Sequence, residues 1–319
     1  PPPSGGGGGG GGAATGSGPA TATVPPATVS RVAGADREAT AVAVSQASFP
    51  DGGAGAVVLA QEGAFPDALA GSALAVARDA PILLTSPAGL DAAVRAELTR
   101  VLAKGRTVYL LGGDAALSPA VASAVQGLGY RVVRYGGVDR FATAVDIARA
   151  VGAPSRILVA RGDAFPDALS AAAATGVPGA VVVLTNGPAM PSETAAYLAS
   201  HPGVAAFAIG GPAARADPHA TAIVGPDRFS TSTLVAARLF PQPTQAGIAS
   251  GLDFPDALAA GPALARAGAP LLLSGAATLP ASVSSYLAGA RAGLAGVLVY
   301  GGSAAISDAV VRAVRSALA

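Results

Sequence analysis

An aspartate followed directly by an arginine occurs at three places in this sequence: Asp36-Arg37, Asp139-Arg140 and Asp227-Arg228. Each aspartate stands where a helix N-cap is expected, so its carboxylate can accept hydrogen bonds from the first backbone amides of a helix. Each arginine then lies in the first helical turn, where a cation opposes the helix dipole. Another interaction must offset that cost, either an internal salt bridge or an anionic ligand held by the planar guanidinium. The residues alone leave both interpretations open.

A second aspartate recurs within the five-residue sequence Phe-Pro-Asp-Ala-Leu, which starts at residues 65, 165 and 254. Proline lacks an amide proton and has a fixed φ, which suits the first position of a helix, and it disfavours the helical region for the residue before it. The aspartate complements the positive end of the helix dipole. We therefore expect an abrupt helix start, with the phenylalanine and leucine in the core. The carboxylates of Asp67, Asp167 and Asp256 are candidate partners of the arginines.

Two further motifs accompany each copy in the same order. A hydrophobic run that ends in a hydroxyl residue follows the Phe-Pro-Asp-Ala-Leu segment, and a glycine pair closes the unit. The runs are Leu83-Leu84-Thr85, Val183-Leu184-Thr185 and Leu272-Leu273-Ser274, and the pairs are Gly112-Gly113, Gly210-Gly211 and Gly301-Gly302. Four motifs repeated three times in one order identify a triplicated unit. The repeat is too long for a solenoid, so each unit can hold its own core.

Short β-rich segments alternate with alanine-rich helical patterns in every unit. In the first unit we expect strands at 57–60, 81–85, 107–111 and 131–135, and helices at 66–77, 91–102 and 119–125. Strands without polar alternation are covered on both faces, and strand–helix–strand alternation indicates a parallel sheet with right-handed crossovers. The predicted fold class is α/β, with mostly parallel sheets. Because the motifs follow strands, they converge on the carboxyl edge, where open α/β sheets bind ligands.

The domain organisation follows from composition and from the repeats. Residues 1–27 consist mainly of Gly, Pro, Ala, Thr and Ser, and we expect a flexible tether that has neither the basic nor the apolar region of a signal peptide. The three units are predicted at 28–130, 131–220 and 221–319.

Composition excludes several classes of function. The net charge of +1 and the 12% of charged residues give no bulk attraction to nucleic acid or to an anionic membrane. The absence of cysteine removes disulfides, thiol catalysis and cysteine-ligated metals. The two histidines, His201 and His219, have no partners at metal-ligand spacing. The uncharged run 169–192 contains glycines and prolines that break a spanning helix, so we expect a buried helix, a turn and a buried strand there.

Enzyme interpretations find little support in these residues. There is no nucleophile elbow and no Walker loop, and a helix start accounts for every candidate carboxylate. We predict no metal, no cofactor and no catalytic residue. Repeated binding units are common because multivalency adds avidity. Two more arginines, Arg31 and Arg134, lie six residues before Arg37 and Arg140, and Ala222 occupies the matching position of the third unit.

The motifs together resemble the cell-wall-binding repeat 2 family. The resemblance is carried by residues 31–37, 39–41, 65–69, 81–85 and 110–113, and it extends over about residues 28–319. It implies Toprim-like α/β units, three of which pack into a pseudo-threefold assembly. It also implies a secreted, non-catalytic module at the cell wall or cell surface of a Gram-positive bacterium. The implied partner is an anionic secondary wall polymer or a peptidoglycan-associated glycan, bound non-covalently without membrane insertion by a chain that we expect to be a monomer.

The resemblance directs attention to the strand ends and to the nearby charged residues. The second unit departs from the pattern, because Val181 stands where Pro81 and Pro270 occur. The candidate ligand-binding residues are Arg31, Asp36, Arg37, Arg134, Asp139, Arg140, Asp227, Arg228, Asp67, Asp167, Asp256, Leu83, Leu84, Thr85, Leu272, Leu273 and Ser274. Two alternatives remain: the accessory region of a peptidoglycan hydrolase of the N-acetylmuramoyl-L-alanine amidase type, and a surface-layer component that binds copies of itself.

Overall fold

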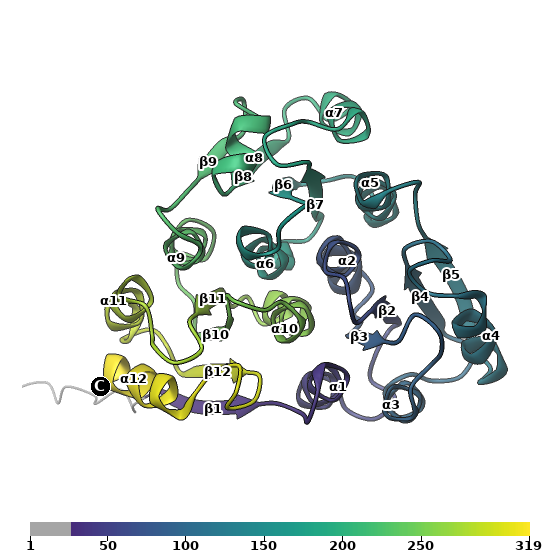
Figure 1. The fold of residues 1–319 in the computed structure, drawn as a ribbon, viewed down its shortest axis with the longest axis horizontal. Helices are drawn as coiled ribbons and strands as arrows, with labels where there is room; N and C mark the ends of the chain where they lie inside the picture. Colours follow the sequence, from purple (N-terminus) through teal and green to yellow (C-terminus); the bar gives the residue numbers. More distant parts are fainter. Residues whose placement is uncertain (1–26) are drawn as a thin grey trace, which may run out of the picture.

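Three four-stranded parallel sheets surround a common centre in the computed structural model, which describes residues 27–319 (Figure 1). The first sheet has the order β3 (Ile82–Thr85), β2 (Val57–Gln61), β4 (Thr107–Leu111) and β5 (Arg131–Tyr135). The second has β7 (Ala180–Thr185), β6 (Arg156–Arg161), β8 (Ala205–Ile209) and β9 (Thr221–Ile223). The third has β11 (Leu271–Ser274), β10 (Gln245–Ser250), β12 (Gly296–Tyr300) and β1 (Thr28–Val32). The predicted tether, apart from Ala27, lies outside the described residues.

The first strand of the described chain belongs to the last sheet. β1 pairs in parallel with β12, from Thr28 opposite Gly296 to Val32 opposite Tyr300. β5 and β9 occupy the same edge position in the first and second sheets. The sheets therefore cross the unit boundaries predicted at 130/131 and 220/221. Pairing between the two ends of the described chain closes three tandem units into a ring.

Three groups of helices cover the sheets. The central helices α2 (Pro66–Ala77), α6 (Pro166–Ala173) and α10 (Pro255–Arg266) meet in the middle of Figure 1. The junction helices are α1 (Arg37–Ser48), α5 (Arg140–Val151) and α9 (Arg228–Leu239), and each contacts the central helix of one unit and an edge strand of the next. The outer helices are α3 (Ala92–Val101), α4 (Pro119–Gly127), α7 (Ser192–Ala199), α8 (Gly211–Ala216), α11 (Ala281–Ala290) and α12 (Asp308–Leu318).

Each sheet buries both faces, as the unbroken hydrophobic strands require. On β2, Val58 and Ala60 belong to a central core shared by all three units, while Val57 and Leu59 pack beneath the outer helices of their own unit. The small residues of the central helices allow close packing. A Cβ on Gly261 of α10 would lie 2.8 Å from Cβ of Ala172 on α6. The alanine-rich composition is therefore a packing requirement of helices that are buried on nearly every side.

The phenylalanines that precede the central helices converge at the centre of the ring. The ring centroids of Phe65, Phe165 and Phe254 are 5.6–6.0 Å apart, and all three rings pack on the central core. Aromatic pairs at this separation contribute about 0.5–1.5 kcal/mol beyond their buried area. The expectation that proline excludes these residues from the helical region is wrong, because Phe65 has φ −89° and ψ −29°. Convergence of the three rings overrides that local preference.

The structure confirms the α/β fold class and the mainly parallel sheets. The strands predicted at 107–111 and 131–135 have those bounds, and the helix predicted at 66–77 is α2. The uncharged run from residue 169 forms the rest of α6, a 3-10 turn (Ala174–Gly176) and β7, as expected. No helix within residues 27–319 combines the length and the apolar character needed to cross a membrane.

Removal of β1 should open the ring. We compare a chain that starts at Ala35 with one that starts at Ala27, so that only the strand and its connection differ. Loss of β1 leaves the edge of β12 unpaired and removes Ala27 and Val29 from the third core. We expect the melting temperature to fall by roughly 5–10 °C, with faster hydrogen exchange in β12. Equal melting temperatures and equal exchange would contradict closure by β1.

Candidate functional site

The arginine of each Asp-Arg motif lies at the carboxyl edge and makes a hydrogen bond with a loop of its own unit. Its Nη1 atom donates a hydrogen bond to a backbone carbonyl in the loop that follows β2, β6 or β10. The pairs are Arg37 with Glu62 at 3.0 Å, Arg140 with Gly162 at 2.7 Å and Arg228 with Gly251 at 2.6 Å. Hydrogen bonds with one charged partner contribute about 1.5–3 kcal/mol. This contact offsets the unfavourable position of the arginine in the first helical turn, and it differs from both interpretations offered by the sequence.

The aspartate of each Asp-Arg motif is an N-cap, as predicted. Oδ1 of Asp36 accepts from the amide of Ala39 at 2.8 Å, and Asp139 and Asp227 make equivalent contacts with their own helices. All three have extended backbone angles. The capping oxygen is used locally, and the exposed carboxylates remain beside the arginines at the surface.

The aspartate of each Phe-Pro-Asp-Ala-Leu segment faces the arginine of the neighbouring unit. Burial raises the pKa of Asp67 above its ordinary value, and the positive charge of Arg140 partly offsets this rise. Burial likewise raises the pKa of Asp167 and of Asp256, and Arg228 and Arg37 oppose the change. Within residues 27–319, no ion pair joins these aspartates to these arginines. The internal salt bridge considered from the sequence is therefore replaced by a longer-range attraction across each junction.

The glycine pair that ends each unit makes room for that aspartate. The first glycine has a φ of +88° at Gly112, +85° at Gly210 and +104° at Gly301, a region in which L side chains are strained. A Cβ at any of them would overlap Oδ2 of the aspartate in the same unit, Asp67 in the case of Gly112. Glycine is thus required both by the backbone angle and by the close approach of the carboxylate.

The upstream arginines stabilise the glycine turns. Arg134 of β5 donates to the carbonyls of Gly112 and Gly113 at 2.9 and 3.1 Å, and Arg31 of β1 donates to the carbonyl of Gly301 at 2.6 Å. The equivalent residue of the third unit is Ala222, which cannot donate such hydrogen bonds. Ala222 lies in β9, so the second sheet lacks this arginine. These side chains have a structural role at the same edge, and they remain candidates for ligand contact only through their unused donors.

The hydrophobic strand ends do not reach the surface. Leu83, Leu84, Leu272 and Leu273 have an exposed fraction of 0% because their strands lie between two helical layers. The hydroxyls that follow are also buried: Thr85 donates to the carbonyl of Gly89 at 3.1 Å, and Ser274 donates to the carbonyl of Gly275 at 3.0 Å. The sequence placed these residues in the ligand site, and the structure places them in the core. Their side chains shape the edge from within.

A pocket of about 320 Å³ lies at the junction between the third sheet and α1, which we call the third–first junction. It brings together Asp36 and Arg37 from the start of α1, Asp253 and Asp256 from the start of α10, and the glycine turn after β12 at Gly302. Two segments more than 200 residues apart in the chain thus form one site. The motifs predicted to converge on the carboxyl edge do converge, but across units.

The site is equipped for hydrogen bonding to a polar ligand. Each junction arginine uses only Nη1 within the described residues, which leaves its other N–H donors available. The pocket at the third–first junction contains three carboxylates, which accept hydrogen bonds, and one guanidinium, which donates. The carboxylates suit a ligand rich in hydroxyl groups, and Arg37 is the one group among the pocket residues that can bind an acidic group. No nucleophile–base arrangement is present among the pocket residues.

One pair of carboxyl groups, those of Glu38 and Glu62, was not predicted from the sequence. Burial, followed by a hydrogen bond with the carboxyl of Glu62, raises the pKa of Glu38 to about 7 from its ordinary value of 4.5. The equivalent positions carry Phe141 with Gly162 in the second unit, and Phe229 with Gly251 in the third. Alignment of the units could have revealed this exchange of an aromatic–glycine pair for two acids.

Comparisons with known proteins agree with the repeat structure. The sequence model of the Cell wall binding domain 2 (CWB2) family matches residues 31–122, 134–218 and 222–311. The N-acetylmuramoyl-L-alanine amidase LytC of Bacillus subtilis (strain 168) is 31% identical over 134 residues, which are 42% of this chain and 26% of the amidase. The solved structures of Cwp8 and Cwp6 from Clostridium difficile superpose with TM-scores of 0.81 and 0.82 at 26% identity.

The two solved structures extend beyond the matched region. The superpositions cover 91% and 92% of this chain, but only 52% of Cwp8 and 48% of Cwp6. The superposed region is therefore about half of each of these proteins, and the 134 residues that match the amidase are about a quarter of it.

Substitution of the two glycines of one turn should show that the fold requires glycine at the first position and not at the second. Gly112→Ala places a Cβ at a positive φ and against Asp67, so we expect a loss of roughly 1–3 kcal/mol in the free energy of unfolding. Gly113→Ala is the matched control, because a Cβ there meets nothing within 4 Å. Urea denaturation measures both. Equal effects of the two variants would contradict the proposed packing of Asp67.

The Glu38–Glu62 pair should make stability depend on pH. The pKa of Glu38 is raised in the folded protein, so folding favours the protonated form, and stability is lost as the pH rises from 4.5 through about 7. Glu38→Gln should therefore melt at a higher temperature than the wild type at pH 8 and at a similar temperature at pH 4. A difference in melting temperature that is the same at both pH values would contradict this assignment.

Proposed function

The chain belongs to the Cell wall binding domain 2 family, and we propose that it is a non-catalytic module that anchors a secreted protein to a wall glycopolymer. The observation that carries this proposal is the junction between units. An arginine with unused donors and carboxylates with free lone pairs recur at three places on one edge of the ring. A repeated polymer offers equivalent groups at intervals, so several weak contacts can act together.

The chemistry of the junctions favours a ligand with both hydroxyl and acidic groups. Carboxylates accept hydrogen bonds from sugar hydroxyls, and arginine donates to acidic groups through parallel N–H bonds. Arg140 is exposed, whereas Arg37 and Arg228 are half-buried. We therefore propose an anionic secondary wall polymer as the ligand, with its hydroxyls at the carboxylate-rich third–first junction. The location that follows is the cell wall or cell surface.

A second candidate function is supported by the match with LytC. That protein is described as an N-acetylmuramoyl-L-alanine amidase, and this chain resembles a part of it. Under this interpretation the three units are the wall-binding region of a peptidoglycan hydrolase. Both candidates assign the same task to the described residues, and they differ in the activity that the units would position on the wall.

A pull-down on purified Gram-positive walls tests the proposed ligand. The protein is incubated with walls before and after acid extraction of the secondary polymers, across a series of salt concentrations. We expect binding to be lost on extraction and to weaken as salt screens the arginines. Binding that survives extraction would indicate peptidoglycan instead, and absence of binding to untreated walls would overturn the proposal.

Substitution of a junction arginine tests the site itself. Arg37→Ala removes both the unused donors and the contact with the carbonyl of Glu62, so we expect wall binding to weaken by roughly tenfold, the equivalent of 1.4 kcal/mol. Arg95→Ala is the matched control, because it removes an exposed arginine on α3, outside the junctions. Binding is measured well below the melting temperature of each variant. Equal binding by the two variants would place the ligand elsewhere.

A further inference from the structure

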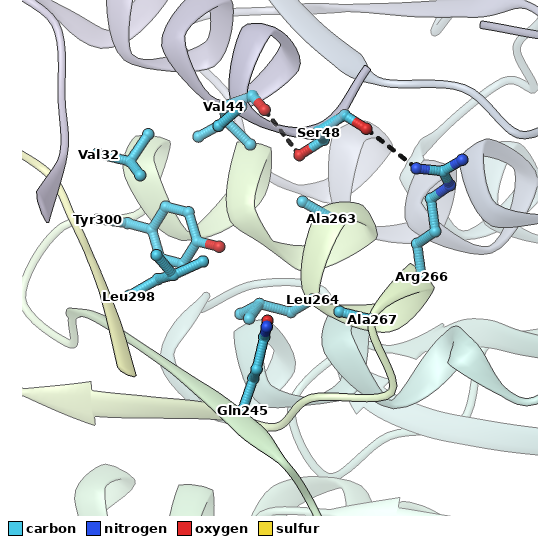
Figure 2. A pocket seen from close by; sticks show the side chains of 11 residues that line it. Val32, Val44, Ser48, Gln245, Ala263, Leu264, Arg266, Ala267, Leu298 and Tyr300 are labelled. Atoms are coloured by element: carbon cyan, nitrogen blue, oxygen red, sulfur yellow. Dashed lines mark hydrogen bonds between the residues drawn. The ribbon is translucent and has the colours of Figure 1, made fainter. Parts of the chain in front are cut away.

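A second pocket, of about 440 Å³, lies between the inner face of the third sheet and helices α1 and α10 (Figure 2). Val32, Leu298 and Tyr300 line it from the sheet, while Val44 and Leu264 line it from the helices. Its rim is formed by Gln245 at the start of β10 and by the last turns of α1 and α10. It shares no lining residue with the pocket at the third–first junction.

The equivalent strand positions in the other two sheets carry aromatic side chains. In the first sheet, Tyr109 and Tyr135 stack with their ring centroids 5.9 Å apart. In the second sheet, the guanidinium of Arg156 lies 5.3 Å from the ring centroid of Phe207. The third sheet has Leu298 in place of Tyr109 and Val32 in place of Tyr135. The pocket therefore arises from smaller side chains at particular positions of one unit.

The hydroxyl of Tyr300 points into this pocket. Tyr300 is only 2% exposed, and its hydroxyl makes no hydrogen bond with any of residues 27–319. In Figure 2 the hydroxyl is directed toward the open space beside Ala263 and Leu264. Burial raises the pKa of Tyr300 above its ordinary value, so the hydroxyl keeps its proton and can donate it in a hydrogen bond. Among residues 27–319 the hydroxyl oxygen is not one of the fully buried polar atoms that lack a partner, so it is accessible from the pocket and can donate to an acceptor bound there.

The tyrosine is accommodated by a compensating glycine. A Cβ on Gly247 of β10 would lie 3.0 Å from Cε2 of Tyr300, and the equivalent positions in the other sheets carry Val58 and Leu158. The third unit therefore combines a large polar side chain on β12 with the smallest residue on β10. The phenol ring of Tyr300 is therefore held in place by packing, and its hydroxyl has no hydrogen-bond partner among the described residues.

The charge at the rim is already neutralised. Nε of Arg266 donates to Oδ1 of Asp79 at 2.8 Å, and Nη1 donates to the carbonyl of Ser48 at 3.0 Å. The same guanidinium lies 4.6 Å from the ring centroid of Phe49. The only charged side chain among the pocket residues is therefore engaged by the protein. An anionic or cationic ligand would have no counter-charge inside, which favours a neutral ligand.

We propose that this pocket binds a small neutral molecule that has an apolar body and an oxygen atom placed to accept a hydrogen bond from Tyr300. The aliphatic walls contact the body, and the Tyr300 hydroxyl orients the oxygen. Pockets of about 300–1,000 Å³ with apolar walls and a few polar groups are typical ligand sites. The proposal is independent of wall binding, because the two pockets lie on different residues and recognise different chemistry.

The test uses p-cresol and toluene as a pair of probes that differ only in the hydroxyl. Titration of the full chain is followed by the methyl resonances of Val32, Val44, Leu264 and Leu298. We expect p-cresol to shift these methyl groups and to bind more tightly than toluene. Failure of both probes to shift them, or equal affinities for the two, would overturn the proposal.

Two variants sharpen the result. Tyr300→Phe keeps the shape of the ring, so it should weaken p-cresol binding by roughly tenfold and leave toluene binding unchanged. Val32→Tyr combined with Leu298→Tyr reproduces the tyrosine pair of the first sheet and should abolish binding of both probes. If the double variant fails to fold, Tyr300→Phe alone still decides. An unchanged p-cresol affinity in Tyr300→Phe would contradict the assigned role of the hydroxyl.

Discussion

The architecture depends on two interactions of each junction arginine, a hydrogen bond to a carbonyl of its own unit and an attraction to an aspartate of the neighbouring unit. The hydrogen bond holds the first turn of each junction helix against a loop of one sheet while the same guanidinium faces an aspartate of the other. The arginine would be unfavourable at that position in an isolated helix. The hydrogen bond offsets that cost within one unit, and the attraction to the aspartate of the neighbouring unit is added only in the assembled ring. The Asp-Arg motif is therefore a device for joining units, and any ligand site built on it exists only after the units have joined.

Ring closure extends this arrangement to the whole molecule. β1 completes the third sheet, so the junction between the last and first units is built like the other two. The three phenylalanines then meet at the centre, and the three Asp-Arg motifs lie around them on the same edge. Only a closed ring presents three equivalent junctions on one face. This geometry connects a packing constraint to multivalent binding of a polymer.

The sequence predicted local structure well because local rules determine it. Proline at the helix starts, aspartate at the N-caps and unbroken hydrophobic strands each identified an element of the fold. The pairing of β1 with β12 was not predicted, because no local pattern encodes a partner some 270 residues away. Leu83 and Leu272 were assigned to the site because they lie beside the edge in sequence, yet their strands are buried on both faces.

Differences among the units contain information that a search for common motifs overlooks. The acidic pair Glu38 and Glu62 and the pocket beside Tyr300 both arise where one unit departs from the other two. Their signals are present in the sequence as pairs of compensating changes. They become interpretable only when the structure shows which positions face each other. Shared motifs thus describe the frame, and departures from them locate the distinctive chemistry of this chain.

Hydrogen exchange with and without purified secondary wall polymer tests the central claim most directly, because it locates the ligand on the chain. The account predicts slower exchange at the three junctions, in the amides near Arg37, Arg140 and Arg228 and in the glycine turns that face them. Exchange at the opposite edge of the sheets, such as residues 103–106 before β4, should be unchanged. Protection confined to that opposite edge, or protection at none of the three junctions despite binding, would contradict it.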